Sequence, residues 1–322
     1  MTLLDLIASD FGVVVDEVDK IVRTASHRYK TFHIPKRHGG QRTIHHPSQE
    51  LKGLQRWVHF RILSKLRVHR SAMAYRPGVS ARHNALEHAG ARYLLRLDMS
   101  NFFPSLSRAD VVGCLSRNMS EIATIFGQRL TQDDLESVAR ITCRKDRLTI
   151  GAPTSPCLSN LIMYEVDSRL SSYCDGRGIT YTRYADDLYF STEKKGVLFD
   201  VSEVVERCLD EVEIPQRVAL NHAKTHHSSK GGRQSVTGLV LTCDGRVSIG
   251  RQQKRILKCM VHQLNELGPS ERRILAGWLS YCKSVEPSYL NYLVRKYSER
   301  QVRRALRGYD LLEERAHAPA TQ

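Results

Sequence analysis

Three aspartates in two separate segments are the residues of this sequence best suited to chemistry. Asp98 ends the apolar run YLLRLD, and Asp186 and Asp187 stand together in TRYADDLYF. Phosphoryl transfer from a nucleoside triphosphate uses two divalent cations roughly 4 Å apart, and magnesium prefers hard oxygen ligands. The three carboxylates are therefore candidate ligands for a pair of magnesium ions, if the chain brings the two segments together.

Two predicted elements would position these carboxylates. Residues 93–98 have the pattern of a strand, and residues 179–191 that of a β-hairpin turning at the two aspartates. If the strand and the hairpin pair in one antiparallel sheet, the three side chains meet. An aspartate pair is also common in an ordinary turn, where its side chains bind the local backbone, so neither segment decides the matter alone.

The remaining pattern predicts a mixed α+β chain with a helical C-terminal part. After residue 250, an apolar stripe is accompanied by a basic helix face. The other expected elements are helices at 3–9, 15–25, 49–69, 160–170 and 201–211, a mostly helical stretch at 107–143, a hairpin within 28–47, and strands at 235–242 and 246–249.

Composition points to a basic protein without membrane spans. Lys and Arg total 49 against 34 Asp and Glu, a formal net charge of +15 over 322 residues. Such an excess favours a polyanionic partner, although a generally basic surface explains it equally well. No apolar run approaches 18 residues, and the eight cysteines form no C-x-x-C pair. We therefore expect a reduced, cytoplasmic protein with no membrane partner.

The neighbours of the aspartates resemble a known family. YADD (184–187) resembles the catalytic box of reverse transcriptases, which are RNA-directed DNA polymerases. Further segments resemble the family's other motifs in the family's order: PKRHGGQRTIHHP (35–47), LDMSNFFPSL (97–106), GAPTSPCLSN (151–160) and NHAKT (221–225). YADD alone is a weak signal, whereas the ordered set spans most of the chain.

The resemblance implies an α+β right-hand polymerase fold, with an antiparallel palm sheet backed by helices. The implied divisions are N-terminal helices and fingers (1–92), palm with the first aspartate (93–106), a helical insertion of fingers and palm (107–150), palm with the YADD hairpin (151–249), and a three-helix thumb (250–322). A thumb of this size leaves no room for an RNase H or maturase domain.

The resemblance also implies roles for individual residues. The metal ligands would be Asp98, Met99, Asp186 and Asp187, holding two Mg²⁺ ions or substituting Mn²⁺. The nucleotide-binding residues would be Lys36, Arg42, Phe103, Gly151 and Ala152. Lys36 and Arg42 would grip the triphosphate, and Phe103 would block a ribose 2′-OH. Lys224 would protonate the leaving pyrophosphate as a general acid. The family often has Gln where this chain has Ile150.

The plain alternatives to these roles are a solvated basic hairpin, a core aromatic, a simple turn and an exposed lysine. They stay open at this point.

Two shorter segments resemble the retron reverse transcriptases in particular. Residues 84–88 match an N-A-x-x-H signature and residues 236–238 a V-T-G signature. If 84–88 is helical, Asn84 and His88 share a face and could bind RNA together; a capping Asn and a surface His are the plain alternative. The implied RNA-binding residues are Asn84, His88, Val236, Thr237, Gly238, Arg251, Lys254, Arg255 and Lys258.

A retron enzyme would bind its cognate structured noncoding RNA as template and primer, together with dNTPs. It would prime from an RNA 2′-OH and make a branched RNA–DNA molecule, in anti-phage defence with a separately encoded effector. The alternatives are a group II intron-like, diversity-generating or abortive-infection reverse transcriptase, a noncatalytic RNA-binding protein on the same fold, and a carboxylate-dependent nuclease.

Overall fold

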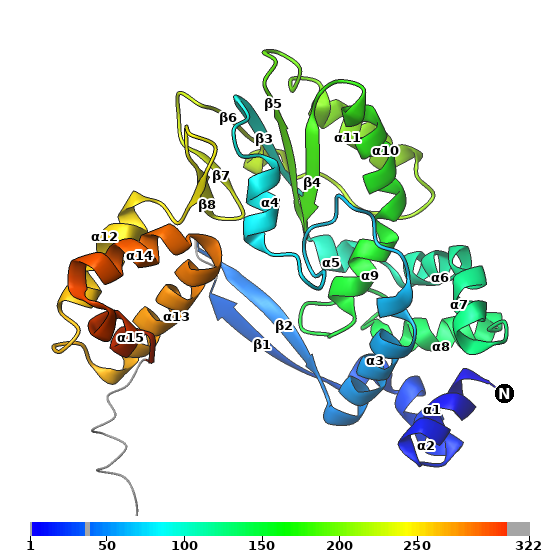
Figure 1. Ribbon diagram of the computed structural model, residues 1–322. Coiled ribbons are helices and arrows are strands. Elements are labelled where there is room, and N and C mark those ends of the chain that lie inside the picture. The colour runs from blue at the N-terminus through cyan, green and yellow to red at the C-terminus, as the bar shows by residue number, and fades with distance from the viewer. Residues whose placement is uncertain (1, 36–38, 308–322) are drawn as a thin grey trace, which may run out of the picture. The chain divides into compact units, whose positions relative to one another are not determined.

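The computed structural model describes residues 2–35 and 39–307, which divide into two compact units (Figure 1). Unit 1 comprises Met1–Val79 and Tyr93–His227, and unit 2 comprises Ser80–Arg92 and Ser228–Gln322. This division differs from the expected boundaries. The strands after residue 233 group with the C-terminal helices rather than with the YADD hairpin, because helix α4 (Ala81–Glu87) packs against them.

The centre of unit 1 is an antiparallel sheet that joins the two aspartate segments. Strands β3 (Tyr93–Asp98), β4 (Thr180–Tyr184) and β5 (Asp187–Thr192) lie in the order β4-β5-β3, and β6 (His226–Ser229) follows next to β3. Both β3 and β4 run antiparallel to β5. The predicted strand and hairpin are therefore confirmed, and they pair as the carboxylate argument requires.

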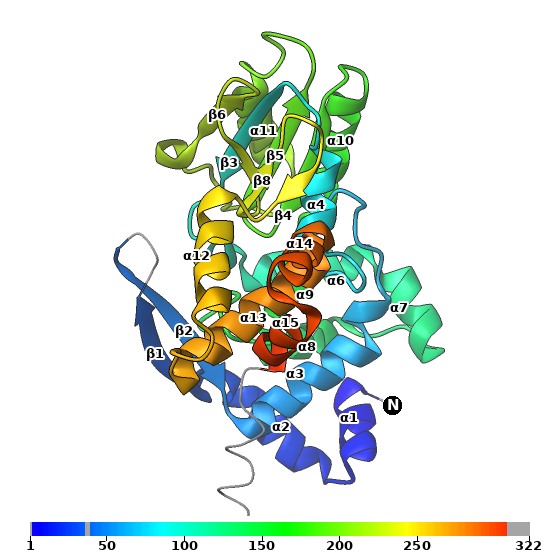
Figure 2. The same ribbon diagram turned by 60° about the vertical axis from the view of Figure 1, so that its left-hand side comes forward.

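Alternation along the strands gives this sheet two different faces. Leu95, Leu97, Leu188 and Phe190 lie in the main hydrophobic core of unit 1. Helices α10 (Tyr164–Asp175) and α11 (Val201–Glu211) contribute to the same core and lie beside the sheet (Figures 1 and 2). The residues between these apolar positions point to the opposite face, which leaves the carboxylates outside the core.

The rest of unit 1 is mainly helical and carries a second, two-stranded sheet. Strands β1 (Tyr29–Pro35) and β2 (Gln41–Pro47) form the predicted hairpin. The helices are α1 (Leu3–Phe11), α2 (Val15–Arg23), α3 (Gln49–Arg61), α5 (Phe102–Ser105), α6 (Arg108–Arg117), α7 (Met119–Phe126), α8 (Gln132–Thr142) and α9 (Ser155–Ile162), with 3₁₀ turns at Ala25–His27, Leu63–Lys65 and His222–Lys224. Capping boxes fix the starts of α1, α6 and α8.

Unit 2 combines helix α4 with a small sheet and a helical bundle. Strands β7 (Gln234–Val236), β8 (Leu239–Leu241) and β9 (Val247–Ser248) form one antiparallel sheet. The bundle contains α12 (Arg251–His262), α13 (Pro269–Val285), α14 (Pro287–Tyr297) and α15 (Glu299–Arg307). Within residues 250–307, four helices therefore stand where three were predicted, because Ser298, with a φ of 82°, ends α14 before the charged stretch that forms α15.

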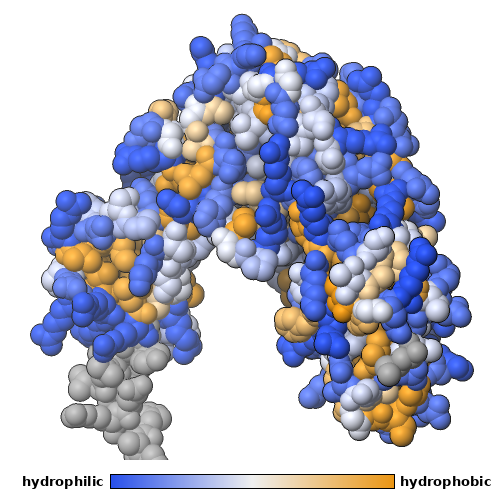
Figure 3. Space-filling model, turned by 45° about the vertical axis from the view of Figure 1, so that its right-hand side comes forward, coloured by the Kyte–Doolittle hydropathy of each residue, from blue (hydrophilic) through white to orange (hydrophobic). Residues whose placement is uncertain are grey.

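Two predicted helices of unit 1 also end differently. The helix expected at 49–69 stops at Arg61 and gives way to a 3₁₀ turn. The helix expected at 160–170 is two helices, α9 and α10, separated at Met163. Hydrophilic side chains cover most of the face seen in Figure 3, and hydrophobic ones form separate patches. Within residues 2–35 and 39–307, no helix has the length and apolarity to cross a bilayer.

Candidate active site

The backbone brings all three aspartates to one end of the central sheet. Asp98, the last residue of β3, is the register partner of Asp187, the first residue of β5. Directly opposed residues of paired strands project to the same face, so these two side chains are neighbours. Asp186 precedes Asp187 in the turn after β4, and its carbonyl accepts a hydrogen bond of 3.0 Å from the Met99 amide.

Each strand carboxylate is bound to a cation. The Lys224 ammonium donates to both oxygens of Asp98, at 2.8 and 3.0 Å. The Arg96 guanidinium donates through Nε and one Nη to a single oxygen of Asp187, at 3.0 and 2.8 Å. Two like charges opposed across a strand pair repel each other. Lys224 and Arg96 therefore stabilise an arrangement that would otherwise be unfavourable.

The surroundings of Asp186 and Asp187 disfavour the charged form of both carboxylates. Burial raises the pKa of Asp186, and the charge of Asp98 raises it further. Burial also raises the pKa of Asp187, against the opposing effect of Arg96. A cation at this end of the sheet would lower both pKa values and stabilise the charged carboxylates.

The ligand atoms of this site suit magnesium, although the side chains do not form a preorganised coordination site. Asp98, Asp186 and Asp187 supply hard oxygens. Met99 is buried, and its thioether does not suit magnesium, so only its carbonyl oxygen qualifies as a ligand. In the described part of the chain, no three His, Cys, Asp or Glu side chains form a ready metal site. An ion would have to displace Lys224 and Arg96 from the carboxylates.

The β1–β2 hairpin places an arginine within electrostatic range of the aspartates. Arg42 is exposed, and its charge opposes the rise in the pKa of Asp186. The hairpin is joined to the 150–152 turn by a 2.8 Å hydrogen bond from the His45 amide to the Ile150 carbonyl. Lys36 lies outside the described residues.

Gly151 allows the backbone of the hairpin to approach the 150–152 turn closely. Its φ is +111°, and a Cβ there would lie 2.5 Å from the His45 carbonyl oxygen. The chain therefore needs glycine for the close approach of the hairpin backbone. Ala152 is only 3 % exposed. The expectation that these two residues admit a nucleotide is thus qualified for Ala152, which is packed inside. Gly151 is exposed, and only the side on which a Cβ would lie is closed by the hairpin.

An aromatic pair lies near the carboxylates. The rings of Phe103 and Tyr75 are 6.4 Å apart, and the charge of Asp186 contributes to a raised pKa of Tyr75, whose main cause is burial. Tyr75 is 49 % exposed and has a φ of 61°, which is unusual for a bulky residue and is typical of functional sites. Phe102 is buried, whereas Phe103 is partly accessible.

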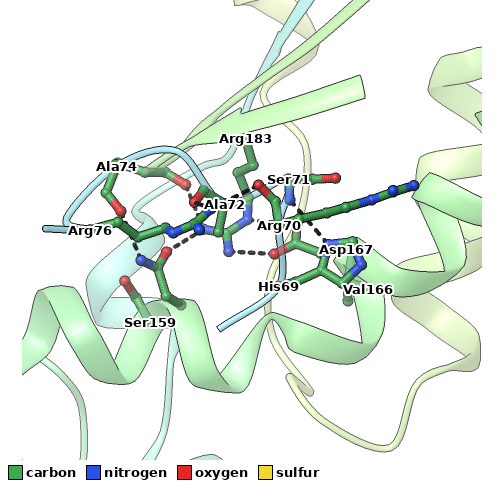
Figure 4. A network of polar contacts seen from close by, with 12 residues as sticks. His69, Arg70, Ser71, Ala72, Ala74, Arg76, Ser159, Val166, Asp167 and Arg183 are labelled. Atoms are coloured by element: carbon green, nitrogen blue, oxygen red, sulfur yellow. Dashed lines mark hydrogen bonds and ion pairs between the residues drawn. The ribbon is translucent and has the colours of Figure 1, made fainter. Parts of the chain in front are cut away.

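A buried polar network around Arg183 and Asp167 is bonded to the turn that carries Asp186 (Figure 4). Arg183 and Asp167 are both 0 % exposed and form a bidentate ion pair. The Arg183 Nε and one Nη donate to the two Asp167 carboxylate oxygens at 2.8 and 2.6 Å. The other Nη of Arg183 donates to the carbonyl of Ala185, the turn residue with a φ of 59°, and to the Asn160 side chain. The pair therefore fixes the turn that presents Asp186 and Asp187.

The same network anchors the segment that carries Tyr75. The Arg183 backbone exchanges two 2.7 Å hydrogen bonds with the chain, donating to Ser71 and accepting from Met73. The Asn160 amide donates to the Ala74 carbonyl at 2.8 Å. One cluster thus positions the turn at Ala185 and Asp186 and the segment that carries Tyr75.

Comparison with known proteins assigns the chain to a family. A family model described as reverse transcriptase (RNA-dependent DNA polymerase) matches residues 34–270. The Retron Ec83 reverse transcriptase of Escherichia coli is 32 % identical over 94 % of this chain and 95 % of its own. The Retron Ec86 reverse transcriptase of the same species is 31 % identical over 91 % and 90 %. The chain belongs to the retron reverse transcriptases.

This assignment confirms the expected right-hand fold and RNA-directed DNA polymerase activity. Reverse transcriptases of this kind use divalent metal ions. Among solved structures, an apo telomerase from Candida Tropicalis truncated from its C-terminal domain is similar, at 18 % identity and a TM-score of 0.47. That similarity covers 68 % of this chain and 54 % of the telomerase.

The retron signature residues of this reverse transcriptase lie in unit 2, and several of them are buried. Asn84 and His88 are both 0 % exposed. The face that they share therefore points into the unit rather than to solvent, and RNA binding by these two residues stays a prediction. Thr237 donates a 3.1 Å hydrogen bond to the Ala81 carbonyl of α4. Val236 is buried, and Thr237 and Gly238 have φ of 50° and 81°. The two signatures thus form one packed assembly.

Burial makes His88 sensitive to acid, which gives a testable result. Its pKa is lowered to about 3 by burial. An unfolded histidine has a pKa near 6.5, so the unfolded state binds more protons and stability falls as pH drops below that value. From pH 7.5 to 5 we expect His88 to account for a loss of about 2 kcal/mol in unfolding free energy.

Urea denaturation at a series of pH values measures this loss. The His88→Gln variant should show a correspondingly flatter pH dependence, whereas replacing the exposed His262 by glutamine should leave the slope unchanged. Equal slopes in the wild type and His88→Gln would refute the assignment.

The basic residues predicted on the reverse transcriptase's thumb lie on helix α12. Arg251 and Arg255 are exposed and Lys258 is partly exposed. Lys254 differs, because its ammonium is bound to Glu286 at 2.5 Å. Three of the four cations are thus presented to solvent, and the fourth is held within the bundle.

Sequence reasoning missed several residues of the site. Arg96, Asn221, Tyr189 and Arg183 all contact the aspartates or their turn. Asn221 donates its amide to the Asp98 carbonyl at 2.8 Å, and the Tyr189 hydroxyl lies 3.2 Å from Asp187. An arginine inside each of two strands of the central sheet, Arg96 in β3 and Arg183 in β4, was the available signal, because a charge within a packed strand needs a partner.

Proposed function

We propose that this reverse transcriptase copies a cognate structured noncoding RNA, starting from an RNA 2′-OH, and produces a branched RNA–DNA molecule. The main support for polymerase activity at this site is the pairing of Asp98 with Asp187 across adjacent strands, with Asp186 in the adjoining turn. The retron family membership supports the RNA-primed, branched product. Anti-phage defence with a separately encoded effector, in the cytoplasm, completes the proposal at the family level.

Asp98, Asp186 and Asp187, with the Met99 carbonyl, would hold two Mg²⁺ ions, or Mn²⁺ in their place. Bound there, the ions would activate the attacking hydroxyl and neutralise the leaving pyrophosphate. Lys224 and Arg96 hold Asp98 and Asp187 in place before binding. Released from Asp98, Lys224 would donate a proton to the leaving pyrophosphate.

The incoming nucleotide would be held by the hairpin and the aromatic pair. Arg42, with Lys36, would bind the triphosphate, because an arginine fork matches phosphate oxygens. Phe103 would exclude a ribose 2′-OH. Gly151 would let the backbone approach the nucleotide and would also accommodate the hairpin, whereas the buried Ala152 would act by positioning the turn.

RNA contacts are assigned to unit 2. Arg251, Arg255 and Lys258 would bind backbone phosphates without reading sequence. Asn84, His88 and Val236 would act indirectly, by fixing the shape of the loop at Thr237 and Gly238. In this proposal residues 250–307 serve as thumb, residues before Tyr93 and much of 107–150 contribute fingers, and the central sheet is the palm.

Phe103→Ala should weaken the preference for deoxynucleotides. Opening the space beside the sugar should reduce the ratio of kcat/KM for dGTP to that for GTP by roughly 10- to 100-fold, the order of discrimination a site achieves against one added hydroxyl. Single-nucleotide incorporation on an RNA template measures both values. The matched control is Phe199→Ala, since Phe199 is 77 % exposed. An unchanged ratio would remove Phe103 from the role of sugar gate.

The overall function is tested by expressing the protein from its gene together with the flanking genomic DNA, and by sequencing the nucleic acid that copurifies with it. A DNA strand joined to RNA through a 2′-linkage is the expected result. Unbranched DNA, or RNA alone from an enzyme active in primer extension, would contradict the retron mode of priming.

A further inference from the structure

Unit 2 contains a cavity for which the proposed function names no ligand. Its volume is about 520 Å³, within the range of small-molecule sites. Its lining residues come from the β8–β9 turn and from helices α12 and α14, all within unit 2. The lining residues that matter are Arg246, Lys254, Arg255, Lys258, Tyr289 and Tyr292.

Two stacked tyrosines give this cavity an aromatic wall. The rings of Tyr289 and Tyr292 are 6.0 Å apart and inclined by 22°. Tyr289 is fixed, because it is 6 % exposed and its hydroxyl donates to the Lys254 carbonyl. Tyr292 is 40 % exposed, so one ring remains accessible for stacking against a planar group.

The charges around the cavity favour an anion. Glu286, the acidic residue of the lining, is engaged by Lys254 and by the Ile249 amide at 3.1 Å. Arg255 and Lys258 have no carboxylate partner among the residues that the structure describes. Two uncompensated cations thus lie beside an exposed aromatic ring.

We propose that this cavity binds one unpaired nucleotide, with its base stacked on Tyr292 and its phosphate bound by Arg255 and Lys258. A base has a π-face whatever its identity, and stacking on an aromatic side chain combined with phosphate contact is a sequence-tolerant way to hold single-stranded nucleic acid. The proposal deepens the proposed RNA binding and rests on it. The nucleotide belongs to a strand or is free, and the experiment separates these sources.

The test uses the full-length protein and an eight-residue single-stranded RNA that carries one 2-aminopurine. Stacking on Tyr292 should quench the fluorescence and allow titration at several salt concentrations. Tyr292→Ala should weaken binding roughly 10-fold, and Tyr292→Phe should retain it, because the ring is what stacks. The double variant Arg255→Gln, Lys258→Gln should reduce the slope of log K against log salt by about 1.4.

A matched double variant, Arg295→Gln with Lys296→Gln, removes two exposed cations from the end of α14 outside the cavity. It should leave the slope unchanged. Competition by AMP that disappears in Tyr292→Ala supports a free nucleotide as the source, whereas competition by oligomers alone supports a strand. Tyr292→Ala binding as tightly as the wild type, or an abasic oligomer binding as well as the base-containing one, would overturn the proposal.

Primer extension on a preformed RNA template and DNA primer is followed with the same preparations. Quenching that is lost in Tyr292→Ala supports the cavity even if the wild type extends no primer, an outcome that would count against the polymerase function alone. Normal primer extension together with unaltered RNA binding by Tyr292→Ala would overturn the proposed nucleotide binding in the cavity and leave the polymerase function intact.

Discussion

Replacing Asp186 by asparagine should reduce deoxynucleotide incorporation by at least about a thousandfold, because metal ions contribute several kcal/mol to stabilising the charge of the transition state. The change keeps the shape of the side chain and removes the charge that burial and Asp98 already disfavour. Single-turnover extension of a primer on an RNA template at saturating magnesium measures the effect.

The matched control is Asp210→Asn, which makes the same change at an exposed position of α11 in the same unit. It should extend the primer at the wild-type rate. An Asp186→Asn variant that retains more than a tenth of the wild-type rate would exclude this carboxylate as a metal ligand. Thermal unfolding of both variants shows whether either change disturbs the fold.

The second large effect is expected behind the active site. Asp167→Asn leaves the buried Arg183 guanidinium without its carboxylate, and breaking a fully buried pair in this way costs about 3–5 kcal/mol of stability. Arg183 also donates to the Ala185 carbonyl and is bonded through its backbone to Ser71 and Met73. The variant should therefore extend primers more slowly even at temperatures where it remains folded.

Asp175→Asn provides the control for this change on the same helix. Asp175 pairs with Arg70 at 3.0 Å, but both side chains are more than 60 % exposed. Such surface pairs contribute about 0.2–1 kcal/mol, so the variant should unfold close to the wild type. Equal unfolding free energies for Asp167→Asn and Asp175→Asn, from urea denaturation, would show that the network does not support the turn.

The central sheet could be predicted because its signals are local and mutually consistent. Alternation in 93–98 and 179–191, with Ala185 and Asp186 in the turn between the two strands of the hairpin, specified both elements. The pairing of β3 with β5 then followed from the need to bring Asp98 to the other carboxylates. The helix at 201–211 was equally clear from its period.

What the sequence did not reveal depends on contacts between distant residues. Asp167 and Arg183 are 16 positions apart, and nothing in α10 marks Asp167 as different from an exposed acid. The helical face shared by Asn84 and His88 was recognised, but a period cannot tell whether a polar face meets solvent or protein. Lys224 was predicted to act on pyrophosphate, but its bond to Asp98 was not foreseen. Lys224 lies in a 3₁₀ turn 126 residues after Asp98 in the sequence, and only the tertiary fold brings the two together.

The claim on which the account depends is that Asp98, Asp186 and Asp187 together bind two divalent ions. Electron paramagnetic resonance with Mn²⁺, in the presence of an RNA template, a DNA primer and a nonhydrolysable deoxynucleotide, counts the bound ions. We predict two coupled ions in the wild type and loss of the coupled signal in Asp186→Asn. A single uncoupled ion in the wild type, or an identical signal in the variant, would contradict the account.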